Sequence, residues 1–515
     1  MKILLLYPIF PKSFWSFEKA IALIGKKAFM PPLGLITIAA MLPEKWDIKL
    51  VDLNLRPATE AEWDWADMVM MSGMIVQRKD FMARIKEAKS RGKKVVVGGP
   101  YVSSCPELFE AAGADFIVQD EGEITLPMLI RAIENGAESG RFTSGGNKPD
   151  MSTTPVPRYD LLEIDAYSVM PVQFSRGCPF NCEFCDIIVL YGRKVRTKLP
   201  EQVLAELEFL YELGWREMVF LVDDNFIGNK HRVKEMLTQL KPWLEKRGYP
   251  FSFNTETSID LALDRELMAL MVACNFGSVF VGIETPDQDS LEMTGKIQNT
   301  RTPLAVSVRK IMDSGIRVMA GFIIGFDGET KGAGNRIVSF VEESAIPIAA
   351  FSMLQALPGT ALSKRLEKEN RMLEKSGDIN YTTLINFIPS RPVDEIAKEF
   401  MDGFWDLYDP KTFIKRVYRC YRILGEVTFP KKEKGHTKTG KKEIRALWTI
   451  FRRLGIIYSC RVTFWKSFFG ILIHNPRGLG SYLSVIGQIE HFLEYREMIR
   501  DQIQQQLSPV RKRPH

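Results

Sequence analysis

The sequence predicts an α/β protein in three parts: a doubly wound parallel sheet domain, a partial (β/α)6 barrel and a mainly helical C-terminal region. Residues 1–140 alternate short apolar runs with helical periodicity, residues 161–365 repeat this alternation, and residues 366–515 show helices without strands. A chain of 515 residues, 45% hydrophobic and 26% charged, can fill two or three cores. We expect a linker at residues 141–160, where Ser, Gly, Thr and Pro interrupt the pattern.

The first domain contains five runs that predict strands: residues 2–7, 48–52, 68–72, 94–98 and 115–118. Helical periodicity separates them, for example where apolar and charged residues recur every three to four positions after the third run. Such βα repetition predicts a flavodoxin-like sheet, whose ligand crevice lies beyond the carboxyl ends of the strands. Glycines and polar residues follow these runs, so we expect a binding edge there.

The second domain repeats the pattern six times. The predicted strands are residues 172–174, 217–222, 251–254, 278–282, 317–325 and 348–355. The predicted helices between them are residues 200–212, 231–246, 265–274, 303–314 and 334–343. Six units are fewer than the eight of a closed barrel, so we expect a barrel that is open on one side, with its chemistry at the carboxyl ends of the strands.

Three cysteines share one short polar loop after the first barrel strand: Cys178, Cys182 and Cys185, spaced C-x3-C-x2-C. Three thiolates can hold three irons of a [4Fe–4S] cluster and leave the fourth iron open. A zinc site would normally need a fourth ligand, and no histidine precedes His231. A disulfide would leave an odd thiol, and the cysteines show no pairing framework, which favours a reducing cytoplasm. Inert or zinc-binding thiols remain the alternative.

This loop resembles the signature of the radical S-adenosylmethionine (SAM) enzymes. The resemblance implies that the open iron chelates SAM and that an electron from the cluster cleaves SAM to methionine and a 5′-deoxyadenosyl radical, which removes hydrogen from an unactivated carbon. It makes the three cysteines the catalytic and metal-ligating residues. It also implies SAM contacts from Phe184, Asp223 or Asp224, Glu284 and Gly325. Packing, helix capping and an ion pair are plainer explanations for the aromatic, the aspartate pair and the glutamate.

The N-terminal domain resembles the cobalamin-binding domain that precedes many radical SAM domains, through Pro31-Pro32-Leu33-Gly34 and the Gly-Gly and Glu-Gly-Glu turns. The resemblance implies cobalamin contacts from Pro32, Gly34, Ser72, Gly98, Gly99, Glu121, Gly122 and Glu123. Residues 1–230 contain no histidine and hence no Asp-x-His-x-x-Gly pattern, so we expect cobalamin in a His-off state. A vestigial sheet domain without a ligand is the alternative.

Taken whole, the chain resembles the cobalamin-dependent radical SAM proteins that include the hopanoid C-2 methylases. This resemblance implies that methylcobalamin delivers a methyl group to an unactivated carbon of a small molecule or lipid, with an electron donor such as flavodoxin or ferredoxin. A cobalamin-linked radical cyclase or rearranging enzyme shares these motifs, and a non-catalytic cobalamin or iron–sulfur sensor also remains open. A methylthiotransferase would need a second cysteine trio, but the N-terminal region offers only Cys105.

The C-terminal region has predicted helices at residues 397–408, 412–424 and 483–505 and a basic segment between them. Residues 431–466 hold eleven Lys or Arg against two Glu, whereas the whole chain has a net charge of +6. Aromatic residues are interleaved, so the segment can lie on an anionic membrane surface. A solvated helix face is the plainer explanation, and without an RNA-binding module we expect no nucleic-acid partner. We expect a cytoplasmic protein, with peripheral contact at the inner membrane face as the hypothesis to test.

Overall fold

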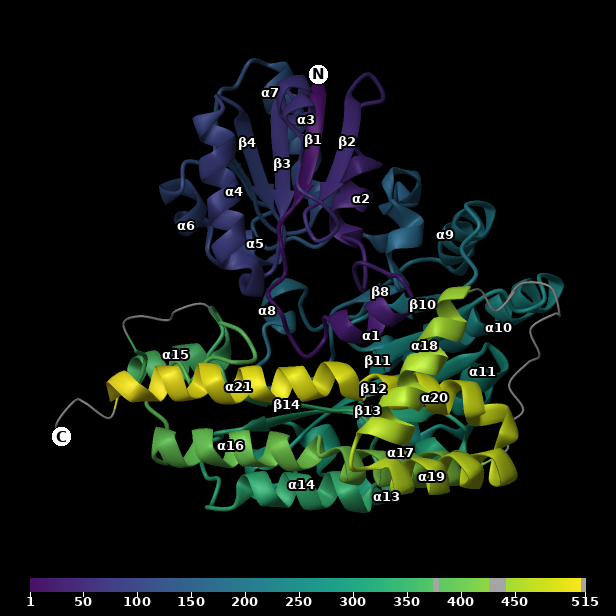
Figure 1. Ribbon diagram of the computed structural model, residues 1–515. Coiled ribbons are helices and arrows are strands. Elements are labelled where there is room, and N and C mark those ends of the chain that lie inside the picture. The colour runs from purple at the N-terminus through teal and green to yellow at the C-terminus, as the bar shows by residue number, and fades with distance from the viewer. Residues whose placement is uncertain (374–378, 426–440, 511–515) are drawn as a thin grey trace.

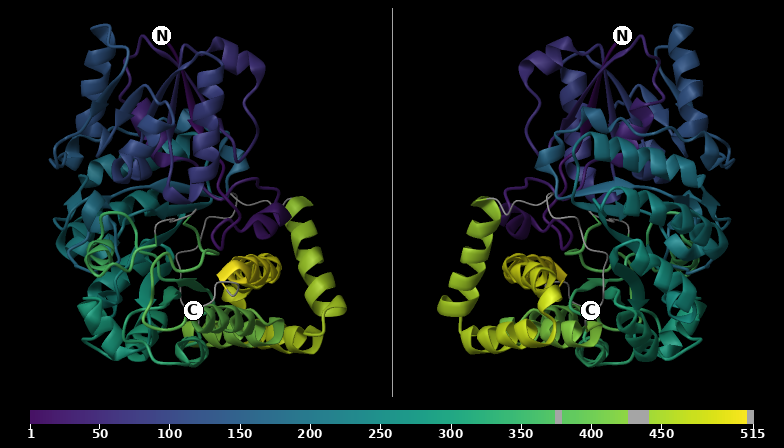
Figure 2. Two further views of the ribbon diagram at one scale, coloured as in Figure 1. Left: turned by 90° about the vertical axis from the view of Figure 1, so that its left-hand side faces the viewer. Right: turned by 90° about the vertical axis from the view of Figure 1, so that its right-hand side faces the viewer.

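The computed structural model describes residues 1–373, 379–425 and 441–510. Two parallel sheets lie one above the other, and the C-terminal helices pack along the lower sheet (Figure 1). The side views show the same three-part arrangement, with the N-terminal sheet domain at one end of the molecule (Figure 2). The predicted fold class is confirmed.

The N-terminal sheet has six parallel strands in the order β2-β1-β3-β4-β5-β6. They are β1 (Lys2–Tyr7), β2 (Asp47–Asp52), β3 (Met68–Ser72), β4 (Lys94–Gly98), β5 (Phe116–Val118) and β6 (Gly140–Phe142). One face packs on α2 (Leu33–Ala39) and α7 (Gly122–Glu134), the other on α3 (Glu60–Trp65), α4 (Arg78–Ser90), α5 (Pro100–Ser104) and α6 (Pro106–Ala111). Sequence analysis missed β6, an edge strand of three residues where a linker was expected.

The lower sheet is an open half barrel in the order β14-β13-β12-β11-β10-β7, with every neighbouring pair parallel. Its strands are β7 (Val169–Val172), β10 (Met218–Leu221), β11 (Ser252–Thr257), β12 (Phe276–Glu284), β13 (Arg317–Ile324) and β14 (Ala349–Met353). The outer helices are α9 (Pro200–Glu212), α10 (Lys230–Lys246), α11 (Arg265–Ala273), α13 (Leu304–Asp313) and α14 (Ala333–Glu343). All predicted strands and helices are confirmed, but the first strand begins and ends earlier than expected.

A short antiparallel ribbon, absent from the predictions, follows the first barrel strand. β8 (Ser175–Arg176) pairs with β9 (Arg196–Thr197). The ribbon brackets the cysteine loop, so the loop leaves and returns at one fixed place beside the sheet. Two-residue strands leave no periodicity in a sequence, which explains why they were missed.

The C-terminal region is helical in the described residues: α15 (Ala361–Lys368), α16 (Val393–Leu407), α17 (Pro410–Leu424), α18 (Lys441–Arg452), the π-helical turn η8 (Arg453–Ile457), α19 (Arg461–His474), α20 (Leu479–Gly487) and α21 (Ile489–Val510). The helical stretch predicted over residues 483–505 is confirmed, but it is divided at Gln488 between α20 and α21. No helix in the described ranges combines the length and apolar character needed to cross a membrane.

An aromatic cluster joins the two ends of the chain. The loop between β1 and α1 (Glu18–Leu23) places Phe14 against Phe492 of α21, with ring centroids 5.1 Å apart, and against Phe404 of α16. His491 Nε2 lies 3.0 Å from the carbonyl oxygen of Ser13. The N-terminal loop, the half barrel and the C-terminal helices therefore share one hydrophobic core.

Candidate active site

The three predicted cluster ligands lie together in the loop that follows β8. Cys182 is buried, Cys178 and Cys185 are half-buried, and all three are free thiols. Burial raises the pKa of Cys178 and raises that of Cys185 to about 12, so these thiols ionise readily only when a cation compensates them. Two amide groups face the sulfurs: Asn225 Nδ2 lies 3.9 Å from Cys178 Sγ, and Gln298 Nε2 lies 3.8 Å from Cys182 Sγ.

The donor set fits an iron–sulfur cluster. Within residues 1–373, 379–425 and 441–510, no three His, Cys, Asp or Glu side chains converge closely enough to hold one metal ion. In a four-iron cluster each thiolate ligates a different iron, so three ligands need not converge on one point. N–H groups directed at sulfur stabilise such clusters and tune their potential. Sequence analysis had not found these amide donors.

The predicted aspartate pair supports the base of the cysteine loop. Asp224 accepts a hydrogen bond from the Gly177 backbone N–H at 3.0 Å, and Asp223 accepts from the backbone N–H groups of Phe174 and Ser175. Burial raises the pKa of Asp223 to about 7 and that of Asp224 to about 6. Neither residue caps a helix here, and a SAM contact from one of them remains a prediction.

Glu284 forms an ion pair, which was the plainer alternative to a SAM contact for this residue. At the end of β12, in a left-handed conformation with φ 66°, it lies 2.6 Å from Lys296 Nζ. Lys296 Nζ also lies 5.9 Å from the ring centroid of Phe184, which packs against Phe326 at 5.6 Å. The ion pair and the aromatic both adjoin the cysteine loop, so the structure brings together two of the residues predicted to contact SAM.

Gly325 has a different neighbour from the one expected. Its φ is 103°, and a Cβ at this position would come within 2.6 Å of Ile385 Cδ1. Its N–H donates to Glu329 Oε2 at 2.8 Å. The glycine therefore makes room for a residue of the C-terminal region, and a SAM contact from it remains a prediction.

Glu256 is a site carboxyl that sequence analysis missed. It lies on β11, and burial and then the negative charges of Asp224, Asp223 and Glu284 raise its pKa to about 8. Its side chain forms no hydrogen bond or ion pair with the described residues. Tyr381 also lies close enough to Glu256 to interact with its carboxyl electrostatically. A charged residue inside the strand pattern Ser-Phe-Asn-Thr-Glu-Thr was the available signal, because alternate positions of a barrel strand face the interior.

Aromatic residues from distant segments close the interior of the barrel near this carboxyl. Trp15 packs edge-on against Phe280 of β12 with centroids 5.1 Å apart, and its Nε1–H donates to Tyr381 Oη at 2.9 Å. One of these residues follows β1, another is on the barrel, and the third is in the C-terminal region. The interior is therefore walled by all three parts of the chain.

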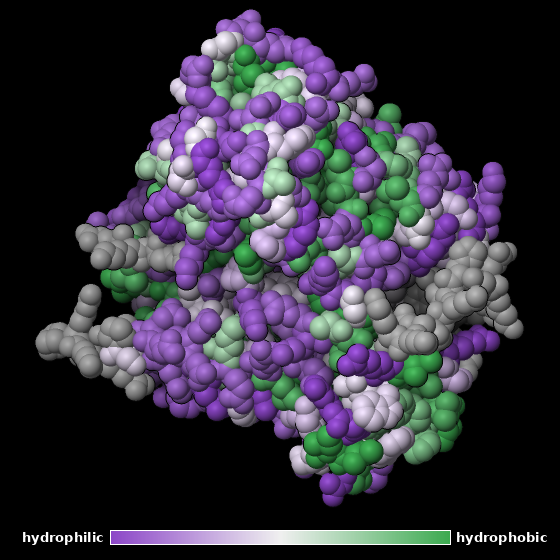
Figure 3. All heavy atoms as spheres, turned by 45° about the horizontal axis from the view of Figure 1, so that its top comes forward, coloured by the Kyte–Doolittle hydropathy of each residue, from purple (hydrophilic) through white to green (hydrophobic). Residues whose placement is uncertain are grey.

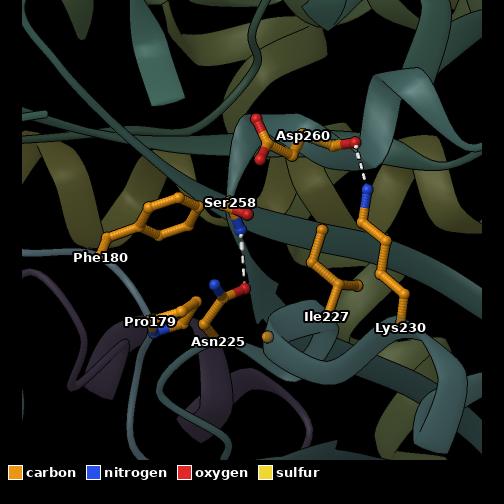
Figure 4. Close-up of a pocket in the computed structure, with 8 residues that line it drawn as sticks. Pro179, Phe180, Asn225, Ile227, Lys230, Ser258 and Asp260 are labelled. Carbon is orange, nitrogen blue, oxygen red and sulfur yellow. Dashed lines mark hydrogen bonds between the residues drawn. The ribbon is translucent and has the colours of Figure 1, made fainter. Parts of the chain in front are cut away.

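A side pocket of about 180 Å³ lies between the cysteine loop and the ends of β10 and β11 (Figure 4). Ser258 N–H donates to Asn225 Oδ1 at 3.1 Å, and Lys230 Nζ donates to the Asp260 carbonyl oxygen at 3.2 Å. Asn225 thus separates the pocket from Cys178. The volume is below the 300–1,000 Å³ of most small-molecule sites, so this pocket is too small to be the main site.

The N-terminal sheet presents its glycines at the carboxyl edge, as predicted. Gly99 has φ 93°, and a Cβ there would collide with Ser72 Oγ at the end of the neighbouring strand. Gly98 ends β4, Pro32 precedes α2, and no atom lies within 4 Å of the Cβ position of Gly34. This edge is shaped by close backbone approaches and open space, which suits a large planar ligand. Cobalamin contacts from these residues remain predictions.

The two predicted glutamates at this edge have other partners. Glu121 lies 2.8 Å from both Arg176 and Arg196, and Glu123 lies 2.8 Å from Arg176. The four side chains are between 3% and 12% exposed. The Cβ position of Gly122 lies 3.2 Å from Ile38, so this glycine allows helix packing. The Glu-Gly-Glu turn therefore ties the N-terminal domain to the ribbon that brackets the cysteine loop.

Family models match successive parts of the chain. Residues 22–130 match the B12 binding domain, residues 172–341 the radical SAM superfamily, and residues 360–505 a domain of unknown function, DUF4070. The first two matches coincide with the upper sheet and the half barrel. Cobalamin, a [4Fe–4S] cluster and SAM are the cofactors that this combination implies.

Relatives cover nearly the full chain. An uncharacterized methyltransferase of Synechocystis is 57% identical over 98% of this chain and 94% of its own length. The hopanoid C-2 methylase of Rhodopseudomonas palustris is 35% identical over 90% of this chain and 88% of its own length.

Solved structures share the fold. The cobalamin-dependent SAM radical enzyme OxsB with aqua-cobalamin bound has a TM-score of 0.62 at 15% identity, covering 99% of this chain and 80% of its own. The radical SAM methyltransferase TsrM of Kitasatospora setae, bound to tryptophan and aza-SAM, has a TM-score of 0.59 at 17% identity, covering 78% of this chain and 83% of its own. By its domains and its relatives, this chain belongs to the cobalamin-dependent radical SAM methyltransferase family.

Proposed function

We propose that this protein methylates an unactivated carbon of an apolar small molecule, with a lipid as the best candidate. The observation that carries the proposal is the buried link between the two cofactor edges. Arg176, two residues before Cys178, is paired with Glu121 and Glu123 of the cobalamin-type domain. This link holds the carboxyl edge of the N-terminal sheet against the cysteine loop of the half barrel. A substrate that is to meet both cofactors in turn needs this arrangement.

The chain's own residues have separable tasks in this proposal. Cys178, Cys182 and Cys185 would hold the cluster, whose role is to supply the electron that cleaves SAM. Glu256 and the aspartate pair would attract the positive charges of SAM. The aromatic wall formed by Trp15 and its partners excludes water and offers an apolar surface to the substrate.

A lipid substrate is supported by the apolar wall and by the similarity to the hopanoid C-2 methylase of Rhodopseudomonas palustris. One SAM would accept the substrate hydrogen and leave as methionine and 5′-deoxyadenosine, and a second would give its methyl group and leave as S-adenosylhomocysteine. An external donor such as flavodoxin or ferredoxin would supply the electrons. The protein would work in the cytoplasm and reach its substrate at the inner membrane face.

The test is anaerobic reconstitution with iron, sulfide and cobalamin, followed by incubation with SAM, a reductant and a lipid extract. The expected result is formation of both 5′-deoxyadenosine and S-adenosylhomocysteine, with a lipid product heavier by one CH₂. A variant with all three loop cysteines replaced by alanine should form neither SAM product. Absence of both products from the reconstituted wild-type protein would contradict the proposal.

A radical cyclase is the second candidate. An anaerobic magnesium-protoporphyrin IX monomethyl ester cyclase of Cereibacter sphaeroides is 25% identical over 58% of this chain and 52% of its own length. A cyclase would form 5′-deoxyadenosine without S-adenosylhomocysteine, so the same assay separates the two reactions.

A further inference from the structure

The C-terminal helices carry an unusual number of large hydrophobic side chains at the surface. Those on α18, η8 and α19 are Ile444, Trp448, Ile456, Ile457, Val462, Phe469, Leu472 and Ile473. Trp448 is 61% exposed and Ile473 is 74% exposed. The eight residues lie on three successive elements, and apolar surface gathered in this way marks an interaction site. We call these eight residues the apolar face.

The apolar face follows helical spacing. Ile444 and Trp448 lie one turn apart on α18, and Val462, Phe469 and Ile473 recur at intervals of seven and four residues on α19. The turn between the helices adds an exposed Ile456-Ile457 pair. The two helices lie at the outer edge of the molecule, away from the N-terminal sheet (Figure 2). Hydrophobic side chains are gathered at the lower right of the surface view (Figure 3).

The segment that carries the apolar face is basic, although Glu443 precedes it and Glu490 of α21 pairs with Arg453. Residues 444–478 contain six Lys or Arg and no Asp or Glu. Arg445, Arg452, Arg461 and Lys466 are exposed. The Arg452 guanidinium lies 5.1 Å from the ring centroid of Trp448, so its charge is presented beside the apolar surface. Interfacial helices on anionic membranes have this composition, with aromatic and aliphatic residues that insert and basic residues that reach the headgroups.

The position of the face suits delivery of a substrate to the barrel. α18 packs against α1, and α1 follows the loop that holds Trp15 in the aromatic wall. α19 packs on α17 and is thereby fixed to the core that includes the half barrel. A surface on which α18 and α19 rested would therefore lie beside the segment that closes the barrel interior.

We infer that α18, η8 and α19 form a docking face for an anionic lipid bilayer, on which the protein lies without crossing it. That the substrate is a lipid rests on the proposed function. That the protein docks on a bilayer rests on the apolar face and on the basic residues beside it. We assign a bilayer and not a protein as the occupant because the exposed aromatic and aliphatic side chains stand among basic residues, and residues 444–478 contain no Asp or Glu.

Vesicle flotation of the full-length reconstituted protein tests the inference. The probes are vesicles of phosphatidylcholine alone and vesicles with added phosphatidylglycerol. We expect binding to the anionic vesicles that is at least about tenfold tighter than to neutral ones and that weakens with salt. Equal binding to both, or no binding, would overturn the inference.

Matched variants locate the face. Trp448→Ser/Phe469→Ser/Ile473→Ser should weaken binding to anionic vesicles about tenfold or more, because three inserting side chains are lost. A control, Leu108→Ser/Leu263→Ser/Val306→Ser, removes exposed hydrophobic residues elsewhere and should bind like the wild type. Equal loss in both variants, or in neither, contradicts the assignment.

Two further measurements separate docking on a bilayer from self-association and from catalysis. If light scattering shows concentration-dependent dimers that the Trp448/Phe469/Ile473 variant loses, while neither protein binds vesicles, the face is an interface between copies and the inference fails. If the wild type binds vesicles as expected but transfers no methyl group, the proposed function fails and the docking face stands. The serine variant should still cleave SAM in detergent solution at the wild-type rate.

Discussion

Two groups of acidic residues at the carboxyl edges of the two parallel sheets lie in opposite environments. At the edge of the N-terminal sheet, Glu121 and Glu123 are paired with arginines. Although burial alone would raise it, the guanidinium of Arg176 holds the pKa of Glu123 below its ordinary value. At the edge of the half barrel, burial raises the pKa values of Asp224 and Glu256, and neither forms an ion pair with the described residues, whereas Glu284 at the same edge is paired with Lys296.

The difference separates a structural edge from a binding edge. Paired carboxylates hold two domains in register but have no charge left for a ligand. Buried carboxyls without cationic partners reduce stability, and proteins retain them chiefly where a ligand or a reaction uses them. SAM carries an ammonium and a sulfonium group, and these cations at the barrel edge would lower the raised pKa values of the carboxyls and favour their charged form. The glutamates of the N-terminal turn have a structural role in these ion pairs, and cobalamin contacts from them remain predictions.

The largest effect should come from removing the cluster ligands. Cys178→Ala/Cys182→Ala/Cys185→Ala should lose iron binding and reduce SAM cleavage to background, because no other thiol lies in the loop. Iron analysis and 5′-deoxyadenosine assay measure the two losses. Cys105→Ala, outside the loop, should keep both. Cluster uptake by the triple variant would show that the barrel edge is not the binding edge.

The ion pairs at the N-terminal edge can be broken by replacing Arg176, which Glu121 and Glu123 share. Arg176→Gln leaves Glu123 without its arginine and Glu121 with Arg196 and the more distant Lys148, so the free energy of unfolding should fall by about 3 kcal/mol. Chemical denaturation measures the change. Arg309→Gln, which removes an exposed ion pair with Asp313, should cost under about 0.5 kcal/mol. If the two variants lose equal stability, the arginine link is not what holds the domains together.

At the barrel edge, we expect the stability of the protein to fall as the pH rises. Because the folded state raises the pKa of Glu256 to about 8, its contribution to stability is full below the ordinary value of 4.5 and is lost as the pH rises through 8. Without SAM, Glu256→Gln should therefore be more stable than the wild type at pH 8 by about 2 kcal/mol, and it should bind SAM more weakly.

Asp223, Asp224, Glu284 and Tyr381 also face Glu256, so the conservative variant Glu256→Asp is the control. It retains a carboxyl in this environment and should retain most of the pH dependence. If the stability of the wild type and of Glu256→Gln depended identically on pH, Glu256 would not be a carboxyl that lacks a cationic partner and binds SAM.

The smallest effect concerns the glycines of the N-terminal edge. Gly99→Ala places a Cβ against Ser72 and should cost about 1 kcal/mol more than Gly136→Ala, which has a similar positive φ but open space around it. Thermal unfolding compares the two. Visible absorption of bound cobalamin should decrease in Gly99→Ala and stay unchanged in the control. Equal cobalamin uptake by both variants would remove this glycine from the binding edge.

Local patterns made most of the fold predictable. The run Lys-Val-Val-Val-Gly at residues 94–98 predicts a buried strand that ends at a glycine, and the structure has that strand with the same bounds. The cysteine spacing is equally local, so the cluster loop could be found without knowing the fold. Both signals depend on neighbours within a few residues.

Long-range pairings could not be predicted in the same way. Arg176 and Glu121 are 55 residues apart, and His491 lies against a backbone oxygen 478 residues away. No periodicity records such contacts, so the glutamates were assigned to cobalamin when the structure pairs them with arginines. Glu256 was missed for the same reason, because its raised pKa depends on carboxyls from neighbouring strands.

Electron paramagnetic resonance of the reduced, reconstituted protein tests the central claim most directly: three thiolates hold a four-iron cluster and leave one iron free for SAM. We expect a four-iron signal in the wild type that changes on addition of SAM, and no such signal in the triple cysteine variant. A wild-type signal that SAM leaves unchanged, or an equal signal in the variant, would contradict the claim.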